Sequence, residues 1–235
     1  MALPKLETPT YETTIPSTGR TIEYRPFLVK EEKILMMAQE SQDTAQAIGA
    51  LKKIISSCTF GKVDPNELTT YDAEFLFLQL RIKSVGETVE FQIKCADPDC
   101  DGMTDVVVDL TQVEVIMPEK EPITNIKLND TIGMTLKEVT LKDAIGLSGK
   151  EMEDITGLVA TVIDTIYDEE KVYNVKDVPK KELATFIDSL NHNQLELVTE
   201  FIQNQPQIKK EVRYTCVKCG KENVIVLSGL QDFFA

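Results

Sequence analysis

The sequence predicts an α+β fold in which a β region is split by a mainly helical insert. Short segments with alternating apolar residues, typical of strands, occur in the first half and again near the end of the chain. Segments with helical spacing dominate the stretch between them, and two pairs of cysteines each stand between two strand-like segments. We therefore expect an N-terminal hairpin plus helical domain over residues 1–86, a β region over 87–140 and 206–235, and a helical insert over 141–205.

Composition limits the class of protein. The 235 residues suffice for one large or two small domains, and 42% apolar with 27% charged residues is an ordinary soluble globular composition. No apolar run approaches the roughly 20 residues that a membrane span needs. The beginning, Met1–Glu7, lacks the pattern of a signal peptide. We expect no membrane partner, and a reducing cytoplasm as the site of folding.

Net charge argues against a nucleic-acid partner. The formal charge is −14, and the sequence contains no basic cluster. Proteins that bind nucleic acid need a basic face that displaces counterions from phosphates. An acidic surface instead favours solubility, or contact with a basic partner.

The N-terminal domain is expected to begin with a hairpin, in which Tyr11–Ile15 and Thr21–Arg25 flank a turn containing Gly19. A helix over 30–40 should follow, with Glu31, Glu32 and Lys33 facing solvent. Asp43 or Thr44 caps the next helix, whose apolar positions run from Ala47 to Ile55. The most apolar helix, Asp72–Lys83, should be central to the first core.

The middle of the chain changes from strands to helices. Residues 111–140 predict two or three strands separated by prolines, Asn129–Asp130 and Gly133. Residues 171–175 predict a short strand or bridge, and Asn191 or Asn193 is expected to cap the last helix. The helices of the insert are expected at Asp143–Leu147, Glu151–Tyr167, Lys180–Ser189 and Gln194–Gln203.

Two cysteine pairs suggest a metal site. Cys95 and Cys100 lie between strand-like segments at 88–94 and 105–110, and Cys216 and Cys219 lie between segments at 211–215 and 223–227. A cysteine pair in a hairpin turn, present twice, is the pattern of a zinc ribbon, in which Zn²⁺ takes four thiolates at about 2.3 Å. Gly220 follows the second pair and can adopt the positive φ that such a turn often needs.

The alternatives to zinc are four reduced buried cysteines or two disulfides. Zinc is favoured by the spacing within each pair and by the expected reducing compartment. The distance between the pairs is unusual for a ribbon, because residues 101–215 separate them. The ribbon would therefore contain a whole inserted subdomain. Four thiolates leave no open position for water, so the predicted role of Zn²⁺ is structural.

Catalytic motifs are not apparent in the sequence. The single histidine, His192, has no nucleophile motif near it and is expected at a helix start. Cys58 ends an apolar helix and is interpreted as a core residue. The acidic run Asp168–Glu170 lacks the alternating oxygen ligands of a calcium loop and is interpreted as a solvated turn. We expect an interaction protein, without enzyme activity or a small-molecule substrate.

Three segments carry a resemblance to a known family. Ile15–Leu35, with its run Ile-Pro-Ser-Thr-Gly-Arg-Thr-Ile-Glu-Tyr-Arg-Pro-Phe, resembles the opening of the baseplate hub proteins of T4-like contractile-tailed phages. Arg81–Glu87 and the Asp109–Leu110 dipeptide after the first cysteine pair are also similar to that family. The resemblance is strongest over the first half of the chain.

The resemblance implies a component of the tail baseplate hub, or a hub assembly factor, that acts through contacts with other baseplate hub or tail proteins. It also implies a location in the host cytoplasm during assembly, or in the virion tail baseplate. The helical insert and Phe233–Phe234 are the expected contact regions. The alternatives are a zinc-ribbon regulator associated with nucleic acid, which the acidic residues around the first cysteine pair oppose, and a hub-associated hydrolase, for which no catalytic constellation is visible.

Overall fold

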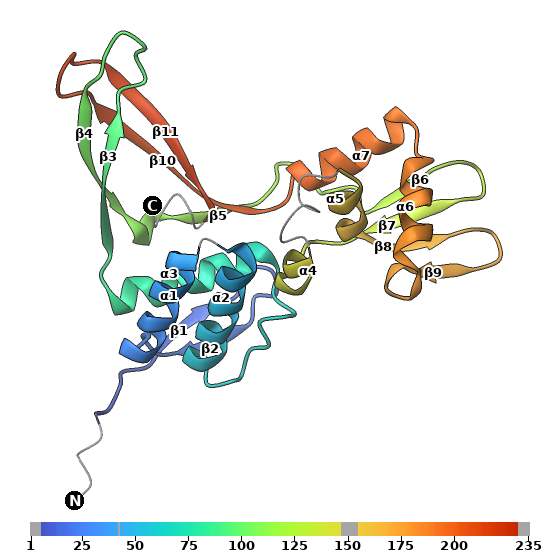
Figure 1. Cartoon of the computed structure of the whole chain (residues 1–235), viewed down its shortest axis with the longest axis horizontal. Coiled ribbons are helices and arrows are strands. Elements are labelled where there is room, and N and C mark those ends of the chain that lie inside the picture. The colour runs from blue at the N-terminus through green and yellow to red at the C-terminus, as the bar shows by residue number, and fades with distance from the viewer. Residues whose placement is uncertain (1–5, 42, 147–154, 230–235) are drawn as a thin grey trace, which may run out of the picture.

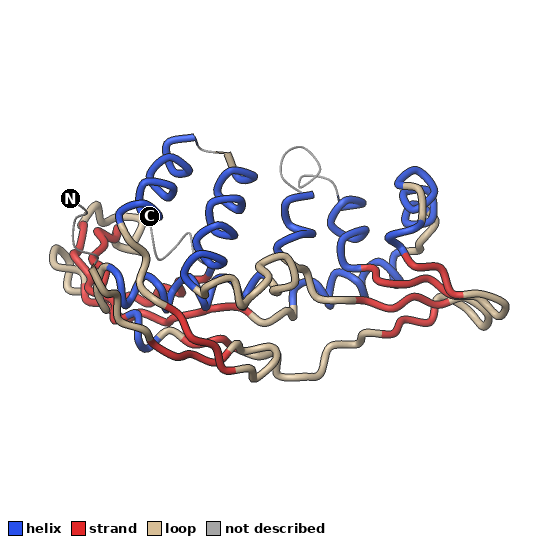
Figure 2. Tube along the Cα trace, turned by 90° about the horizontal axis from the view of Figure 1, so that it is seen from below, coloured by secondary structure: helices blue, strands red, loops and turns tan. Residues whose placement is uncertain are grey.

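The computed structural model describes residues 6–41, 43–146 and 155–229 and shows a mixed α/β chain with several small sheets. Three regions are distinct in Figure 1: a helical unit, two long hairpins that project from it, and a lobe at the right of the view. In Figure 2, helices lie along one side of the molecule and most strands along the other. Residues 1–5 and the expected Phe233–Phe234 contact fall outside the described residues.

The helical unit begins with the predicted hairpin. Strands β1 (Tyr11–Thr14) and β2 (Thr21–Tyr24) pair antiparallel, with Tyr11 opposite Tyr24. Asp43 is the N-cap of the second helix and accepts hydrogen bonds from the N–H groups of Ala45 and Gln46, as one of the two sequence alternatives predicted. The helices of this unit are α1 (Val29–Ser41), α2 (Thr44–Cys58) and α3 (Thr70–Ser84).

Helix α3 belongs to two hydrophobic cores. Ala73 and Leu76 pack with the hairpin β1–β2 and with α2, whereas Leu78 and Ile82 pack against the long hairpins. Apolar residues on more than one side of α3 are buried, which is why the helix lies between other elements. The prediction that this helix is central to the first core is confirmed.

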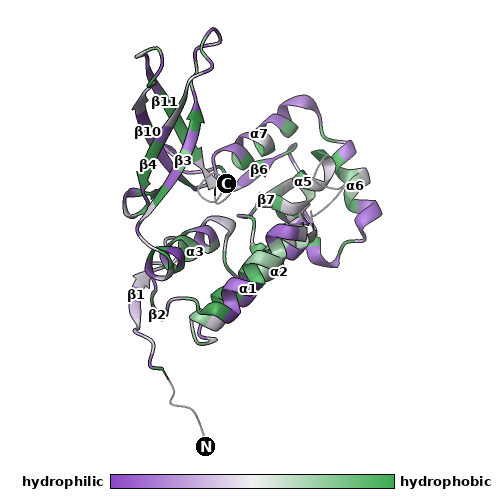
Figure 3. Ribbon diagram, turned by 60° about the vertical axis from the view of Figure 1, so that its left-hand side comes forward, coloured by the Kyte–Doolittle hydropathy of each residue, from purple (hydrophilic) through white to green (hydrophobic). Residues whose placement is uncertain are grey.

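Two long hairpins carry the cysteine pairs at their tips. Strand β3 (Thr88–Lys94) pairs with β4 (Met103–Asp109), and β10 (Gln207–Thr215) pairs with β11 (Glu222–Ser228). Hydrophilic and hydrophobic residues alternate along these strands, as Figure 3 shows. Their apolar faces meet each other and α3 in the second core. The 3₁₀ helix η1 (Leu110–Gln112) leads from β4 to β5 (Glu114–Ile116), which pairs with the start of β10.

The lobe consists of a four-stranded antiparallel sheet with helices against it. The strand order is β6 (Asn125–Lys127), β7 (Gly133–Leu136), β8 (Ile163–Tyr167) and β9 (Val172–Asn174). Asn191 caps the last helix in a capping box with Gln194, as one of the two sequence alternatives predicted. The helical elements are α4 (Leu141–Gly146), α5 (Ile155–Val162), η3 (Val175–Asp177), α6 (Lys180–Asp188) and α7 (His192–Gln203).

Two sequence expectations about the lobe differ from the structure. The expected helix Glu151–Tyr167 ends at Val162, and residues 163–167 form β8 instead. These residues are rich in β-branched and aromatic side chains, and Thr165 forms a 2.6 Å hydroxyl hydrogen bond with Thr135 of β7. In addition, β6 and β7 were expected within the β region of residues 87–140, but they pair with β8 rather than with the long hairpins.

Glu31 was expected to face solvent, and this prediction is wrong. The residue is 2% exposed, and its carboxylate lies 2.9 Å from the guanidinium of Arg25. Ser57 and the N–H of Leu28 also donate to this carboxylate. Although burial alone would raise the pKa of Glu31, hydrogen bonds from Arg25, Ser57 and Leu28 lower it from 4.5 to about 2.

We predict that Glu31→Gln lowers the free energy of unfolding by about 3 kcal/mol at neutral pH, because it leaves the Arg25 charge buried without a partner. The lowered pKa means that the carboxylate stabilises the fold above pH 4.5 and loses this effect as the pH falls to about 2. Urea unfolding at several pH values should show the difference from wild type shrinking toward low pH. Glu32→Gln is the matched control, because Glu32 is exposed; equal losses in both variants would contradict the prediction.

Candidate metal centre

The four predicted cysteines meet where the tips of the two long hairpins approach each other. Their four Sγ atoms all lie within 4.8 Å of one another. The Sγ of Cys95 is 3.7 Å from that of Cys219, and the Sγ of Cys100 is 3.8 Å from that of Cys216. Each short distance therefore joins one cysteine of the first pair to one of the second.

These distances fit a tetrahedral set of metal ligands. Four sulfurs at about 2.3 Å from a central ion are about 3.8 Å from one another. A disulfide would require about 2.05 Å, and all five cysteines are free thiols in this structure. Cys95, Cys100 and Cys216 are buried and Cys219 is exposed, so the cluster lies at the surface of the hairpin tips. The four thiols could hold one metal ion.

Local hydrogen bonds give each cysteine loop its shape. In the first loop, the N–H of Cys95 donates to the carbonyl of Gly102 at 2.8 Å, and the N–H of Cys100 donates to that of Asp97 at 3.0 Å. In the second, the N–H of Gly220 donates to the carbonyl of Cys216 at 2.9 Å. Gly220 has a φ of +73°, as predicted from its position after the cysteine pair.

Backbone N–H groups also point at the sulfurs. The N–H of Gly102 lies 3.4 Å from the Sγ of Cys100, and that of Asp97 lies 3.5 Å from the Sγ of Cys95. Hydrogen bonds from the N–H groups of Cys219 and Lys218 lower the pKa of the Cys216 thiol to about 6. Because the thiolate is the form that binds metals, these donors favour the ligand form of Cys216, whereas burial and the neighbouring thiols raise the pKa values of Cys100 and Cys219.

Gly102 occupies a position that only glycine fits. A Cβ atom at this residue would lie 2.8 Å from the Sγ of Cys216 and 3.2 Å from that of Cys100. It would also lie 2.8 Å from the Cβ of Lys218, in the opposite loop. The absence of a side chain at Gly102 therefore lets the two loops approach each other.

Polar side chains connect the two loops around the sulfurs. Asn223 is 4% exposed; its Oδ1 accepts from the N–H of Ala96 at 3.1 Å, and its Nδ2 donates to the carbonyl of Lys221 at 2.9 Å. The hydroxyl of Thr104 accepts from the N–H of Val217 at 3.2 Å. Sequence reasoning missed Asn223, although its place in the alternation with Ile225 and Leu227 could have identified an inward-facing polar residue.

Two ion pairs also cross between the loops. The ammonium of Lys221 lies 3.0 Å from a carboxylate oxygen of Asp97, and that of Lys218 contacts Asp101. The hydrogen bond from Lys221 lowers the pKa of Asp97. Both pairs are on the surface, where ion pairs add little stability, so they orient the loops more than they stabilise them.

The remaining sequence candidates do not join this cluster. His192 is exposed at the first position of α7. Cys58 is fully buried in the core of the helical unit, where burial raises the pKa of its thiol to about 11. Asp168 accepts hydrogen bonds from the N–H groups of Glu170 and Lys171, which is the expected turn. Among the residues described, no helix is long and apolar enough to cross a bilayer.

Comparison with known proteins gives two matches and one absence. The family described as T4 bacteriophage base plate protein matches residues 8–235. The chain is also 23% identical, over 217 residues, to the baseplate hub assembly protein gp26 of Enterobacteria phage T4. That similarity covers 92% of this chain and 93% of the T4 protein. No solved structure matches the chain. The family match spans nearly the whole sequence, and the chain therefore belongs to the T4 bacteriophage base plate protein family.

Proposed function

We propose that this protein helps to assemble the baseplate hub of a contractile-tailed phage, and that it does so through contacts with other baseplate proteins rather than through catalysis. The observation that carries the proposal is the similarity, over nearly the full length of both chains, to a protein named for baseplate hub assembly. Assembly would take place in the host cytoplasm, before the hub is incorporated into a tail.

Exposed apolar side chains on the helical unit support a role in protein contacts. Val29, Met36 and Met37 of α1 are 65%, 56% and 70% exposed. These positions recur at helical spacing, so the side chains share one side of α1. Methionine adapts its shape to different partners, which suits a surface that binds other proteins during assembly.

A structural zinc ion is the second part of the proposal. Cys95, Cys100, Cys216 and Cys219 would supply its four ligands, and the sulfur distances of 3.7 Å and 3.8 Å support that geometry. Thiolate ligands favour zinc over the hard cations calcium and magnesium. The ion would join two hairpins that are far apart in the sequence, and four protein ligands would leave no position for a substrate.

We predict that the purified protein contains about one zinc per chain, and that Cys216→Ser lowers this content strongly. Because metal binding contributes to folding, the same change should lower the melting temperature by about 10 °C. Elemental analysis and calorimetry measure the two effects. Cys58→Ala is the control, because Cys58 lies outside the cluster: it should keep the zinc. An unchanged metal content in Cys216→Ser would remove zinc from the proposal.

Gly102→Ala tests the close approach of the loops without removing a ligand. The added Cβ would overlap with the Sγ of Cys216, so we expect weaker zinc retention in a competition with a chelator. Gly49→Ala is the matched control, because a Cβ at Gly49 in α2 meets nothing within 4 Å. The control should retain zinc and gain stability by up to about 1 kcal/mol from its higher helix propensity. Equal zinc retention in both variants would refute this role of Gly102.

The assembly role predicts a specific defect in a phage that lacks this protein. Hub proteins should accumulate in the infected cell without forming hubs, and supplying the wild-type protein should restore tails. Affinity purification of a tagged hub protein, followed by mass spectrometry, measures hub formation. A normal yield of complete hubs without the protein would refute the proposal.

Quantitative mass spectrometry of mature particles then separates a transient factor from a permanent part. We expect the protein to be abundant in a lysate stalled during assembly and depleted from particles. Its presence in particles at a fixed ratio to a known hub protein would instead identify it as a structural subunit of the hub.

A further inference from the structure

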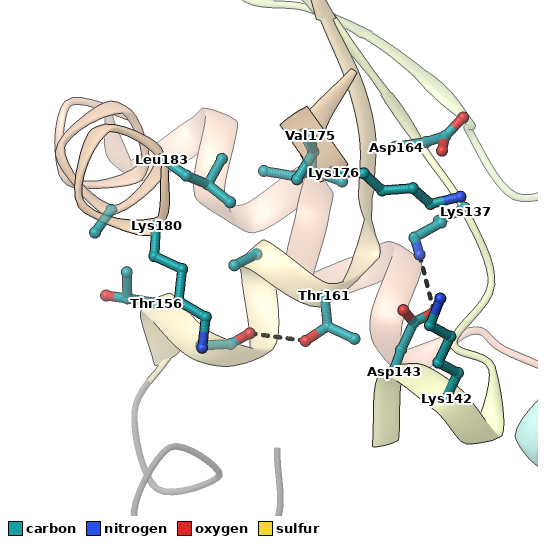
Figure 4. A pocket seen from close by; sticks show the side chains of 14 residues that line it. Lys137, Lys142, Asp143, Thr156, Thr161, Asp164, Val175, Lys176, Lys180 and Leu183 are labelled. Atoms are coloured by element: carbon teal, nitrogen blue, oxygen red, sulfur yellow. Dashed lines mark hydrogen bonds and ion pairs between the residues drawn. The ribbon is translucent and has the colours of Figure 1, made fainter. Parts of the chain in front are cut away.

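A cavity of about 450 Å³ opens in the lobe, between α4, α5, η3 and α6 (Figure 4). Small residues leave the space: Gly157 and Ala160 on α5 and Ala184 on α6. Ile163 and Leu183, which are 1% and 7% exposed, also line it. Pockets of this size and apolar character are typical of binding sites for small molecules or for a few side chains.

Lysines surround this apolar space. Among the residues that the structure describes, Lys137, Lys142, Lys176 and Lys180 line the cavity, together with the carboxylates of Asp143 and Asp164. Figure 4 shows the ammonium groups of Lys137, Lys142 and Lys176 on the same side of the cavity.

Lys137 is neutralised within the protein. The ammonium of Lys137 lies 2.8 Å from a carboxylate oxygen of Asp143, which also accepts from the hydroxyl of Thr140. The side chains of Lys142 and Lys176 form no ion pair or hydrogen bond with any residue that the structure describes. As far as the described part of the chain shows, these two positive charges are available to an external anion.

This concentration of lysines contrasts with the rest of the chain. Acidic residues outnumber lysine and arginine by 39 to 25 in the whole sequence, whereas the described lining of the cavity contains four lysines and two aspartates. A local excess of positive charge on an acidic protein attracts negative groups. The complementary ligand would carry carboxylates beside an apolar side chain.

We propose that this cavity binds a short acidic and apolar segment of a partner protein. An apolar side chain of the segment enters between α5 and α6, and neighbouring carboxylates pair with Lys142 and Lys176. The inference rests on the proposed function only in taking the partner to be another protein of the assembly. A phosphate-rich ligand fits less well, because the apolar walls provide no hydrogen bonds to phosphate oxygens. The net charge of −14 also repels a polyanion.

A model peptide tests this site directly. The probe is a capped pentapeptide in which glutamates at the second and fourth positions alternate with leucines, and its control replaces the glutamates with glutamines. We expect the first peptide to bind the whole purified protein with a Kd of about 0.1 mM at low salt, and the control to bind about tenfold more weakly. In a ¹H–¹⁵N NMR spectrum, the N–H signals of Gly157, Ala160 and Ala184 should shift on binding.

Matched lysine variants distinguish binding at the cavity from a general effect of the protein's charge. The double variant Lys142→Gln with Lys176→Gln should raise the Kd for the glutamate peptide about tenfold. The control, Lys127→Gln with Lys181→Gln, removes the same charge at exposed residues of the lobe that do not line the cavity. Its Kd should stay within about twofold of wild type.

Several results would overturn the proposal: no shift of these signals at about 1 mM peptide, equal affinity for the two peptides, or equal losses in the two double variants. Tighter binding of inorganic phosphate or a short oligonucleotide at the same signals would identify a phosphate site instead. The assembly role is measured in infected cells, so its failure is distinguishable from a failure of this site.

Discussion

Helix α3 is the element on which both halves of the main body depend. Its residues supply apolar side chains to two cores, one with the N-terminal hairpin and α2 and one with the long hairpins. Leu78 and Leu80 are almost completely buried, although they belong to different cores. Because each core uses a different side of one rigid helix, the orientation of the hairpins is fixed relative to the helical unit through α3.

Polar contacts at the ends of α3 keep it in that position. Near its beginning, buried Asp72 accepts from the N–H and the hydroxyl of Ser17, at 3.0 Å and 2.5 Å. At its end, the hydroxyl of Ser84 accepts from the N–H of Phe27 at 2.9 Å. The hydroxyl of Tyr71 lies 3.2 Å from Glu138, in the segment that leads into α4. These buried or half-buried contacts connect α3 to the hairpin, to the start of α1 and to the lobe.

Local sequence patterns predicted the elements whose structure depends on nearby residues. Helical periodicity identified α1 to α3, and the spacing of the cysteines predicted that the two loops would meet. The helical pattern gave a wrong prediction where residues from other elements determine burial. Glu31 is buried because Arg25 and Ser57, which lie outside α1, bind its carboxylate. Apolar residues continue at helical spacing from Ile155 to Ile166, so periodicity could not show that pairing with β7 converts residues 163–167 into a strand. The lysine-lined cavity also depends on contacts between elements that no local pattern contains.

The connection between hairpins and lobe explains how cysteines so far apart in the sequence can meet. Strands β5 and β10 pair antiparallel, with Ile208 opposite Val115, so the chain leaves for the lobe and returns from it at neighbouring points. An inserted unit with adjacent ends imposes little strain on the structure that receives it. The lobe also contacts the helical unit through α4, where Leu141 enters the first core. A ligand in the cavity beside α4 would therefore bind near the contact between the lobe and the body, while the cysteine cluster closes the opposite end of the hairpins.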